Sequence, residues 1–104
     1  MNLSQLRYLC ETVRCRLNIS RAATVLRTSQ PAMSQQIRAL EDELGVPLFV
    51  RTRNRLIRLT DAGQNVVDAA NSALTELAKV QVVARTRMAT QFASLRIEIG
   101  RAHV

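Results

Sequence analysis

The sequence predicts a mainly α-helical fold: three short helices and a two-stranded β-hairpin, followed by one long helix. Three observations lead to this prediction. Apolar residues recur at the helical interval of three or four positions through residues 3–44, with a first helix over residues 3–16. Two β-prone runs then flank a turn at residues 52–55. Finally, Thr60 is a good helix cap, and the helical period resumes after it and continues to about Thr90.

Residues 18–45 predict two helices joined by a tight corner. Ser20 is expected to cap the first of them, and Ser29 precedes Pro31 at the start of the second. Gly45 is expected to end the second helix, because glycine readily adopts the left-handed conformation found after a helix C-terminus. Two such helices in succession predict a helix-turn-helix.

The first turns of the second helix carry polar side chains that donate and accept hydrogen bonds, and the acids Glu41, Asp42 and Glu43 lie at its far end. Base edges in a DNA major groove present mixed donors and acceptors, and phosphates favour the positive N-terminus of a helix. The pattern therefore favours a helix that enters the major groove. An ordinary packed pair of helices with a solvated polar face is the alternative. The expected major-groove residues are Ser29, Gln30, Pro31, Ala32, Ser34, Gln35 and Arg38.

Different roles are expected within this set. Gln30, Gln35 and Arg38 have the side chains that pair with base edges. Ser29 and Ser34 are expected to position the helix on phosphates.

Residues 48–51 and 56–59 are the two β-prone runs, and they predict a hairpin that carries Arg51, Arg53 and Arg55. Beside the recognition helix, such a wing would lie along phosphates or enter the adjoining minor groove. A solvated arginine-rich loop is the alternative, and for Arg51 a further alternative is a structural ion pair with Glu41 or Glu43. With the three helices, the hairpin makes residues 1–60 a predicted winged helix-turn-helix.

Residues 61–90 predict a long linker helix with an unbroken apolar seam. Its seam residues are Val66, Ala70, Ala73, Leu77, Val80 and Ala84. A seam of this length exceeds what so small a domain can cover, which predicts a homodimer through this helix. A second row, Val67 and Leu74, is expected to pack on the winged helix. The alternatives are a helix that lies on its own domain, and a protein-interaction module in which the helix binds another partner.

Fifteen basic residues against eight acidic ones give the chain a net charge of +7, which suits a polyanionic partner. Charge alone would also fit a membrane-surface or ribosome-associated protein. The start of the sequence lacks the features of a signal peptide, so a cytoplasmic location is expected. The chain shows no constellation typical of an enzyme, and Cys10 and Cys15 have no partners that suggest a metal site, so no cofactor is expected. Both thiols are expected to pack in the fold.

The sequence resembles the N-terminal domain of LysR-type transcriptional regulators over about residues 3–99. The resemblance rests on Ala22-Ala23, Ser29–Ala32, Ser34, Gln36-Ile37, Leu40-Glu41, Glu43–Gly45, Leu48-Phe49, Arg51, Leu59-Thr60 and Ala62-Gly63. It implies a sequence-specific DNA-binding protein whose linker helix pairs with a second subunit and leads to an effector-binding domain for a small molecule. Residues 17–20 and 28–31 are most similar to the branch that controls cysteine biosynthesis and sulfur assimilation.

The last residues, 91–104, are expected to be a stub of that effector-binding domain. Residues 94–100 alternate like a strand and resemble its first strand. Residues 99–104 can be back-translated as ATC GGA AGA GCA CAC GTC, which, preceded by the last two bases of a GAG codon for Glu98, resembles the start of a widely used sequencing adapter. We therefore expect a truncated regulator whose last six residues derive from adapter DNA.

Overall fold

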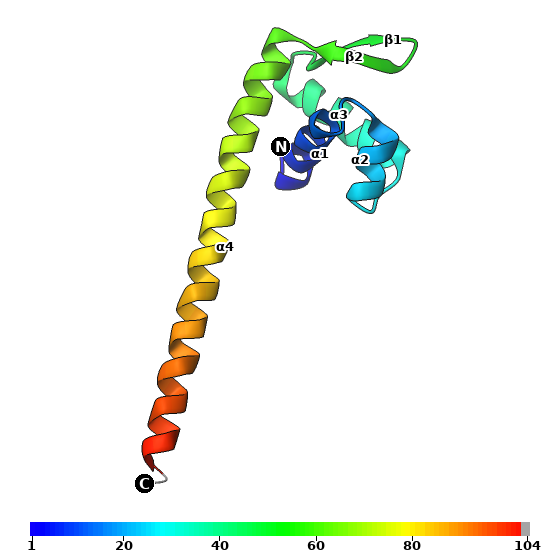
Figure 1. The fold of residues 1–104 in the computed structure, drawn as a ribbon. Coiled ribbons are helices and arrows are strands. Elements are labelled where there is room, and N and C mark those ends of the chain that lie inside the picture. Colours follow the sequence, from blue (N-terminus) through cyan, green and yellow to red (C-terminus); the bar gives the residue numbers. More distant parts are fainter. Residues whose placement is uncertain (103–104) are drawn as a thin grey trace. The chain divides into compact units, whose positions relative to one another are not determined.

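The computed structural model describes the backbone of residues 1–102 and the side chains of residues 1–94. Its elements are α1 (Leu3–Arg14), α2 (Ile19–Val25), α3 (Gln30–Leu44), β1 (Phe49–Thr52), β2 (Arg55–Leu59) and α4 (Asp61–Ala102). The predicted fold class, three helices and a hairpin followed by a long helix, is confirmed (Figure 1). The chain divides into two compact units after Ser72.

Local capping defines the first two helices. At α1, the Gln5 backbone N–H donates to Asn2 Oδ1 at 2.9 Å, while the Asn2 N–H donates to Gln5 Oε1 at 3.1 Å, which forms a capping box. At α2, the cap is Asn18, whose Oδ1 accepts from the Arg21 N–H at 3.0 Å. The prediction that Ser20 caps this helix is therefore wrong. Asparagine caps as well as serine does, so the helix begins earlier.

The second helix of the pair, α3, begins and ends as predicted. Ser29 Oγ accepts from the Ala32 N–H at 3.2 Å, and Pro31 lies in the first turn, where a missing N–H costs no helical hydrogen bond. Gly45 has a φ of +73° and donates its N–H to the Glu41 carbonyl at 2.8 Å. The left-handed backbone that Gly45 supplies turns the chain toward β1.

Two adjoining apolar clusters hold the first unit together. The larger consists of Leu9, Ile37, Leu40, Leu48, Phe49, Leu56 and Val67, and the smaller of Cys15, Ala22, Ala23 and Met33. They draw on every helix of this unit and on both strands, and each buried leucine or isoleucine contributes about 1.5–3 kcal/mol. Because Val67 belongs to this core, the compact unit includes the first turns of α4 and runs past the predicted boundary at residue 60.

The hairpin is antiparallel, with Phe49 opposite Leu59 and Thr52 opposite Arg55. Its two-residue loop has positive φ at Arg53 (51°) and at Asn54 (66°). Two successive left-handed residues make the turn whose twist matches that of paired strands, and asparagine tolerates this conformation well. The turn is therefore narrow, and it carries Arg53 at its tip.

Helix α4 starts as predicted but does not end as predicted. Thr60 Oγ1 accepts from the Gly63 N–H at 2.9 Å, which caps the helix. The helix then continues past Thr90 to Ala102, so the strand expected at residues 94–100 is wrong. A strand needs a neighbour for its hydrogen bonds, whereas a helix satisfies its backbone within its own segment. Residues 99–104 are expected to derive from adapter DNA, and their side chains lie outside the described part of the chain. The backbone of residues 103–104 also lies outside it.

The predicted seam of α4 divides in two. Ala70 is only 3% exposed, and Val66 packs against the larger core cluster, so these two residues face their own domain. The assignment of Ala70 to the dimer seam is wrong, because the core already covers it, whereas the half-buried Val66 keeps part of its surface open. From Ala73 onward the seam is open: Ala73, Val80 and Ala84 are exposed and Leu77 is half-buried. None of the described helices has the length and hydropathy required to cross a bilayer.

Candidate nucleic-acid interface

The predicted major-groove residues lie on the first half of α3, and most of them are accessible. Ser29, Gln30, Pro31, Gln35 and Arg38 are exposed, while Ala32 and Ser34 are half-buried. The Ser29 oxygen accepts the capping hydrogen bond, but its O–H remains able to donate. This surface carries one cation, several hydrogen-bonding groups and no acid, in agreement with the sequence pattern.

The structure brings the turn of the wing beside α3. Arg38 Nη2 donates to Asn54 Oδ1 at 3.4 Å, which is a long hydrogen bond between the helix and the tip of the hairpin. Gln30, at the start of α3, lines one polar pocket together with Asn54 and Arg55. The exposed face of α3 and the cations of the hairpin turn therefore form one continuous surface. Arg53 and Arg55 are both exposed on it.

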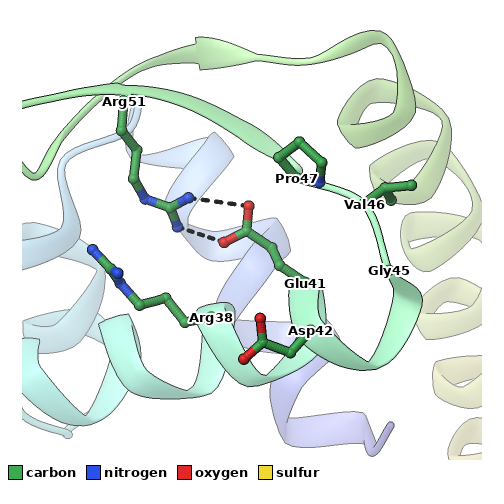
Figure 2. A pocket seen from close by; sticks show the side chains of 7 residues that line it. All are labelled: Arg38, Glu41, Asp42, Gly45, Val46, Pro47 and Arg51. Carbon is green, nitrogen blue, oxygen red and sulfur yellow. Dashed lines mark hydrogen bonds and ion pairs between the residues drawn. The ribbon is translucent and has the colours of Figure 1, made fainter.

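Arg51 has a different place. Its Nη2 donates to Glu41 Oε1 at 2.6 Å and its Nη1 to Glu41 Oε2 at 3.1 Å, and its side chain is only 24% exposed (Figure 2). A guanidinium with two bonds to one carboxylate is held in place by that pair. We therefore correct the expectation that Arg51 is a phosphate contact of the wing: it is an ion-pair partner that fastens β1 to α3.

Glu41 joins three segments at once. Besides Arg51, its Oε2 accepts from the Leu48 N–H at 2.7 Å and from the Phe49 N–H at 3.4 Å. Burial of the carboxyl raises its pKa, but the hydrogen bond from Arg51, the bond from Leu48 and the charge of Arg51 lower it by more, so the pKa lies below its usual value. Glu41 and Arg51 line a second pocket together with Arg38, which lies beside this pair (Figure 2).

Two residues at this surface are absent from the sequence prediction. The Ser20 hydroxyl donates to Gln30 Oε1 at 2.7 Å, which links α2 to the start of α3. Asn54 accepts from Arg38. Asn54 could have been identified, because asparagine in a tight turn favours positive φ. The sequence predicts Ser20 as a helix cap, and no local pattern points to its actual partner.

Neither cysteine belongs to this surface. Cys15 is buried in the smaller core cluster with its Sγ 3.6 Å from Glu11 Oε1, and Cys10 is half-buried, where burial followed by the charge of Glu11 raises the pKa of its thiol. Both thiols are free, and they pack in the fold as predicted. Within residues 1–94, no three His, Cys, Asp or Glu side chains are grouped so that they could hold a metal ion.

Residues 3–64 match the family described as bacterial regulatory helix-turn-helix protein, lysR family. The HTH-type transcriptional regulator CysB of Haemophilus influenzae is 40% identical over 84 residues, which cover 81% of this chain and 26% of CysB. The HTH-type transcriptional regulator SsuR of Burkholderia cenocepacia is 44% identical over 85 residues, which cover 82% of this chain and 28% of SsuR. The chain thus spans about a quarter of the length of these relatives.

Two solved structures with similar folds are complexes with DNA. The CbnR_DBD-DNA complex superposes with a TM-score of 0.73 at 34% identity and covers 83% of this chain and 97% of that one. The BenM_DBD/catB site 1 DNA complex has a TM-score of 0.75 at 29% identity and covers 82% of this chain and 92% of that one. Both matches include nearly all of the domain present in the other structure.

Proposed function

Because this chain belongs to the LysR family of bacterial regulatory helix-turn-helix proteins, we propose that it is the sequence-specific DNA-binding part of a transcriptional regulator. Relatives named CysB and SsuR confirm the predicted similarity to the branch of sulfur and cysteine regulators. A DNA target in a bacterium implies a cytoplasmic location. The observation that carries this proposal is the single surface formed by the acid-free start of α3 and the exposed arginines of the hairpin turn.

In this proposal α3 enters the major groove with its N-terminus forward. Gln30, Gln35 and Arg38 read base edges, while Ser29 and Ser34 donate to phosphates. Pro31 and Ala32 lie between them and fill the groove with small apolar groups. Arg53 and Arg55 hold the backbone or the minor groove beside the site; both are exposed, and Arg55 lines one pocket with Gln30 of α3.

Sequence selection from random double-stranded DNA tests this proposal. The wild-type chain is expected to enrich one motif, and Gln35→Ala is expected to lower discrimination at one base pair by about 1–3 kcal/mol while weak general binding persists. Gln81→Ala is a matched control, because Gln81 is also an exposed helical glutamine but lies outside the proposed surface. If the wild-type chain enriches no sequence, the proposed function is wrong.

We also propose that the chain forms a homodimer through α4 beyond Ala73. Large apolar side chains are unusually open there: Val80, Val83, Met88 and Phe92 are each more than 60% exposed. On this part of the helix Leu77, Val80 and Met88 lie within about 80° of one another around the axis, whereas Val83 and Phe92 lie on opposite sides. Burying the side of Leu77, Val80 and Met88 against a second copy would remove apolar side chains from water, and each contributes about 1.5–3 kcal/mol when fully buried. The half-buried Leu77 and the exposed Val80 lie on one side of the helix and mark the centre of the seam.

Analytical ultracentrifugation of Leu77→Asp/Val80→Asp tests the dimer. The two unpaired charges should convert dimers to monomers, because an unpaired buried charge costs several kcal/mol. Val82→Asp is the control: Val82 is 56% exposed, but two residues after Val80 it lies about 200° further around the helix. The proposed seam is wrong if the double variant still sediments as a dimer. It is also wrong if Val82→Asp dissociates the dimer as much as the double variant does.

A further inference from the structure

The hydrogen bond between Ser20 and Gln30 links the two helices of the helix-turn-helix. Ser20 Oγ donates to Gln30 Oε1 at 2.7 Å, across ten positions of sequence, and both side chains are exposed. Ser20 has no capping duty, because Asn18 performs it. Among the described side chains, the hydroxyl of Ser20 therefore donates its hydrogen bond to Gln30.

This bond determines what Gln30 can offer to a ligand. An amide side chain has an acceptor oxygen and a donor NH₂ group. When a hydroxyl donates to the oxygen, one of its two lone pairs is occupied, whereas both hydrogens on Nε2 remain free. Gln30 held in this way is mainly a donor. Ser20 and Gln30 also line one pocket with Asn54 and Arg55, whose amide and guanidinium supply further donors to the same region.

We propose that Ser20 is a specificity-determining residue of DNA recognition that acts by positioning Gln30. The pair would select a base that accepts hydrogen bonds in the major groove. Guanine presents N7 and O6 there, both acceptors, whereas adenine presents one acceptor and one donor and pairs with an amide through both of its ends. With Oε1 engaged by Ser20, Gln30 favours guanine over adenine at its base pair. The inference rests on the proposed function, since it concerns the same surface.

The role of Ser20 is tested in two steps. The wild-type chain first selects its site from random DNA, and its affinity is then measured for versions of that site with guanine or adenine at each position. Ser20→Ala is expected to lower the guanine-to-adenine preference at one base pair by about two- to tenfold, the typical effect of one net hydrogen bond. Ser20→Thr keeps a hydroxyl and should restore the preference. Thr24→Ala is the matched control, because Thr24 is an exposed hydroxyl of the same helix whose Oγ1 donates to the Ser20 carbonyl at 3.1 Å.

A second set of variants separates positioning from a general structural effect. In a Gln30→Ala background, Ser20→Ala should produce no further change at that base pair, since the hydroxyl acts only through the lost amide. Thermal unfolding of Ser20→Ala should match that of Thr24→Ala. If the effects of Ser20→Ala and Gln30→Ala are additive, or if Ser20→Ala selects the wild-type sequence with an unchanged ratio, Ser20 has no positioning role although the chain still reads DNA. A wild-type chain that selects no sequence overturns the proposed function and this inference with it.

Discussion

Replacing Glu41 with glutamine should destabilise the fold more than any other single exchange of a carboxylate among the described residues. Glutamine has the same shape, so the change removes charge and leaves packing unaltered. It leaves the Arg51 guanidinium, which is only 24% exposed, without its counter-charge. It also exchanges two guanidinium–carboxylate bonds, at 2.6 and 3.1 Å, for at most one bond from the guanidinium to an uncharged amide oxygen.

The size of the effect follows from this geometry. Removing one partner of a buried ion pair costs about 3–5 kcal/mol, and a hydrogen bond to a charged group contributes about 1.5–3 kcal/mol. Because Arg51 keeps some access to water, we expect a loss of about 2–3 kcal/mol. In a domain of this size that corresponds to a melting temperature lower by about 10–20 °C.

Urea and thermal unfolding of the whole chain measure this loss, and Glu43→Gln supplies the control. Glu43 lies on the same helix and pairs with the N-terminal amine of Met1, but both groups are about half exposed. Such a surface pair contributes about 0–1 kcal/mol. A Glu41 variant that loses no more stability than the Glu43 variant would refute the reasoning. A double-mutant cycle with Arg51→Gln isolates the pair, and the two changes should be strongly non-additive.

The same pair predicts a pH dependence with a definite sign. The pKa of Glu41 is lowered by folding, so its contribution is complete above the usual pKa of 4.5 and is lost as the pH falls through the folded value. Glutamine cannot titrate. The difference in unfolding free energy between wild type and Glu41→Gln should therefore be largest near neutral pH and shrink on acidification below about pH 4.5. A gap that stays constant down to pH 2.5 would mean that the carboxylate charge contributes little.

Two further predictions concern the wing and the start of α4. The double variant Arg53→Gln/Arg55→Gln should reduce the slope of log affinity for DNA against log salt concentration by about 0.9 per phosphate contact, or about 1.8 per domain, with an unchanged free energy of unfolding. Arg51→Gln should instead lower the stability of the fold. An unchanged salt slope in the double variant would show that the turn is a solvated loop. Gly63→Ala should destabilise the fold by about 1–3 kcal/mol in urea titrations, because the added Cβ would lie 2.0 Å from the Leu48 carbonyl oxygen. Wild-type stability in that variant would show that α4 shifts without cost.

The elements that the sequence predicts well are those specified by neighbouring residues. Ser29, Pro31 and Gly45 each act within one turn of the helix they bound, so α3 could be placed from composition and spacing alone. The hairpin turn is equally local, with Asn54 in the left-handed conformation that asparagine tolerates. Ser20 shows the limit of this reasoning: two good capping residues lie two positions apart, and the choice of Asn18 determines which hydroxyl remains for Gln30.

The role of each arginine depends on tertiary structure that spacing does not contain. Arg51, Arg53 and Arg55 alternate along one short segment and look equivalent as cations. Only the fold shows that the bend after Gly45 returns β1 to α3, so that Glu41 meets Arg51 across ten positions. The sequence predicted the basic wing and offered Glu41 or Glu43 as an alternative partner for Arg51, but only the fold separates the arginine that builds the surface from those exposed on it.

Helix α4 poses the same question for apolar residues. A row at intervals of three and four identifies a covered face, but the period is identical whether the cover is the chain's own core or a second copy. Val67 and Ala70 are 2% and 3% exposed and complete the core, whereas Val80 is 63% exposed with the same periodicity. The change occurs where the compact unit ends, after Ser72. An apolar row that continues past the edge of its own domain requires another cover to keep it from water, and this is the physical reason to expect a partner on α4 beyond Ala73.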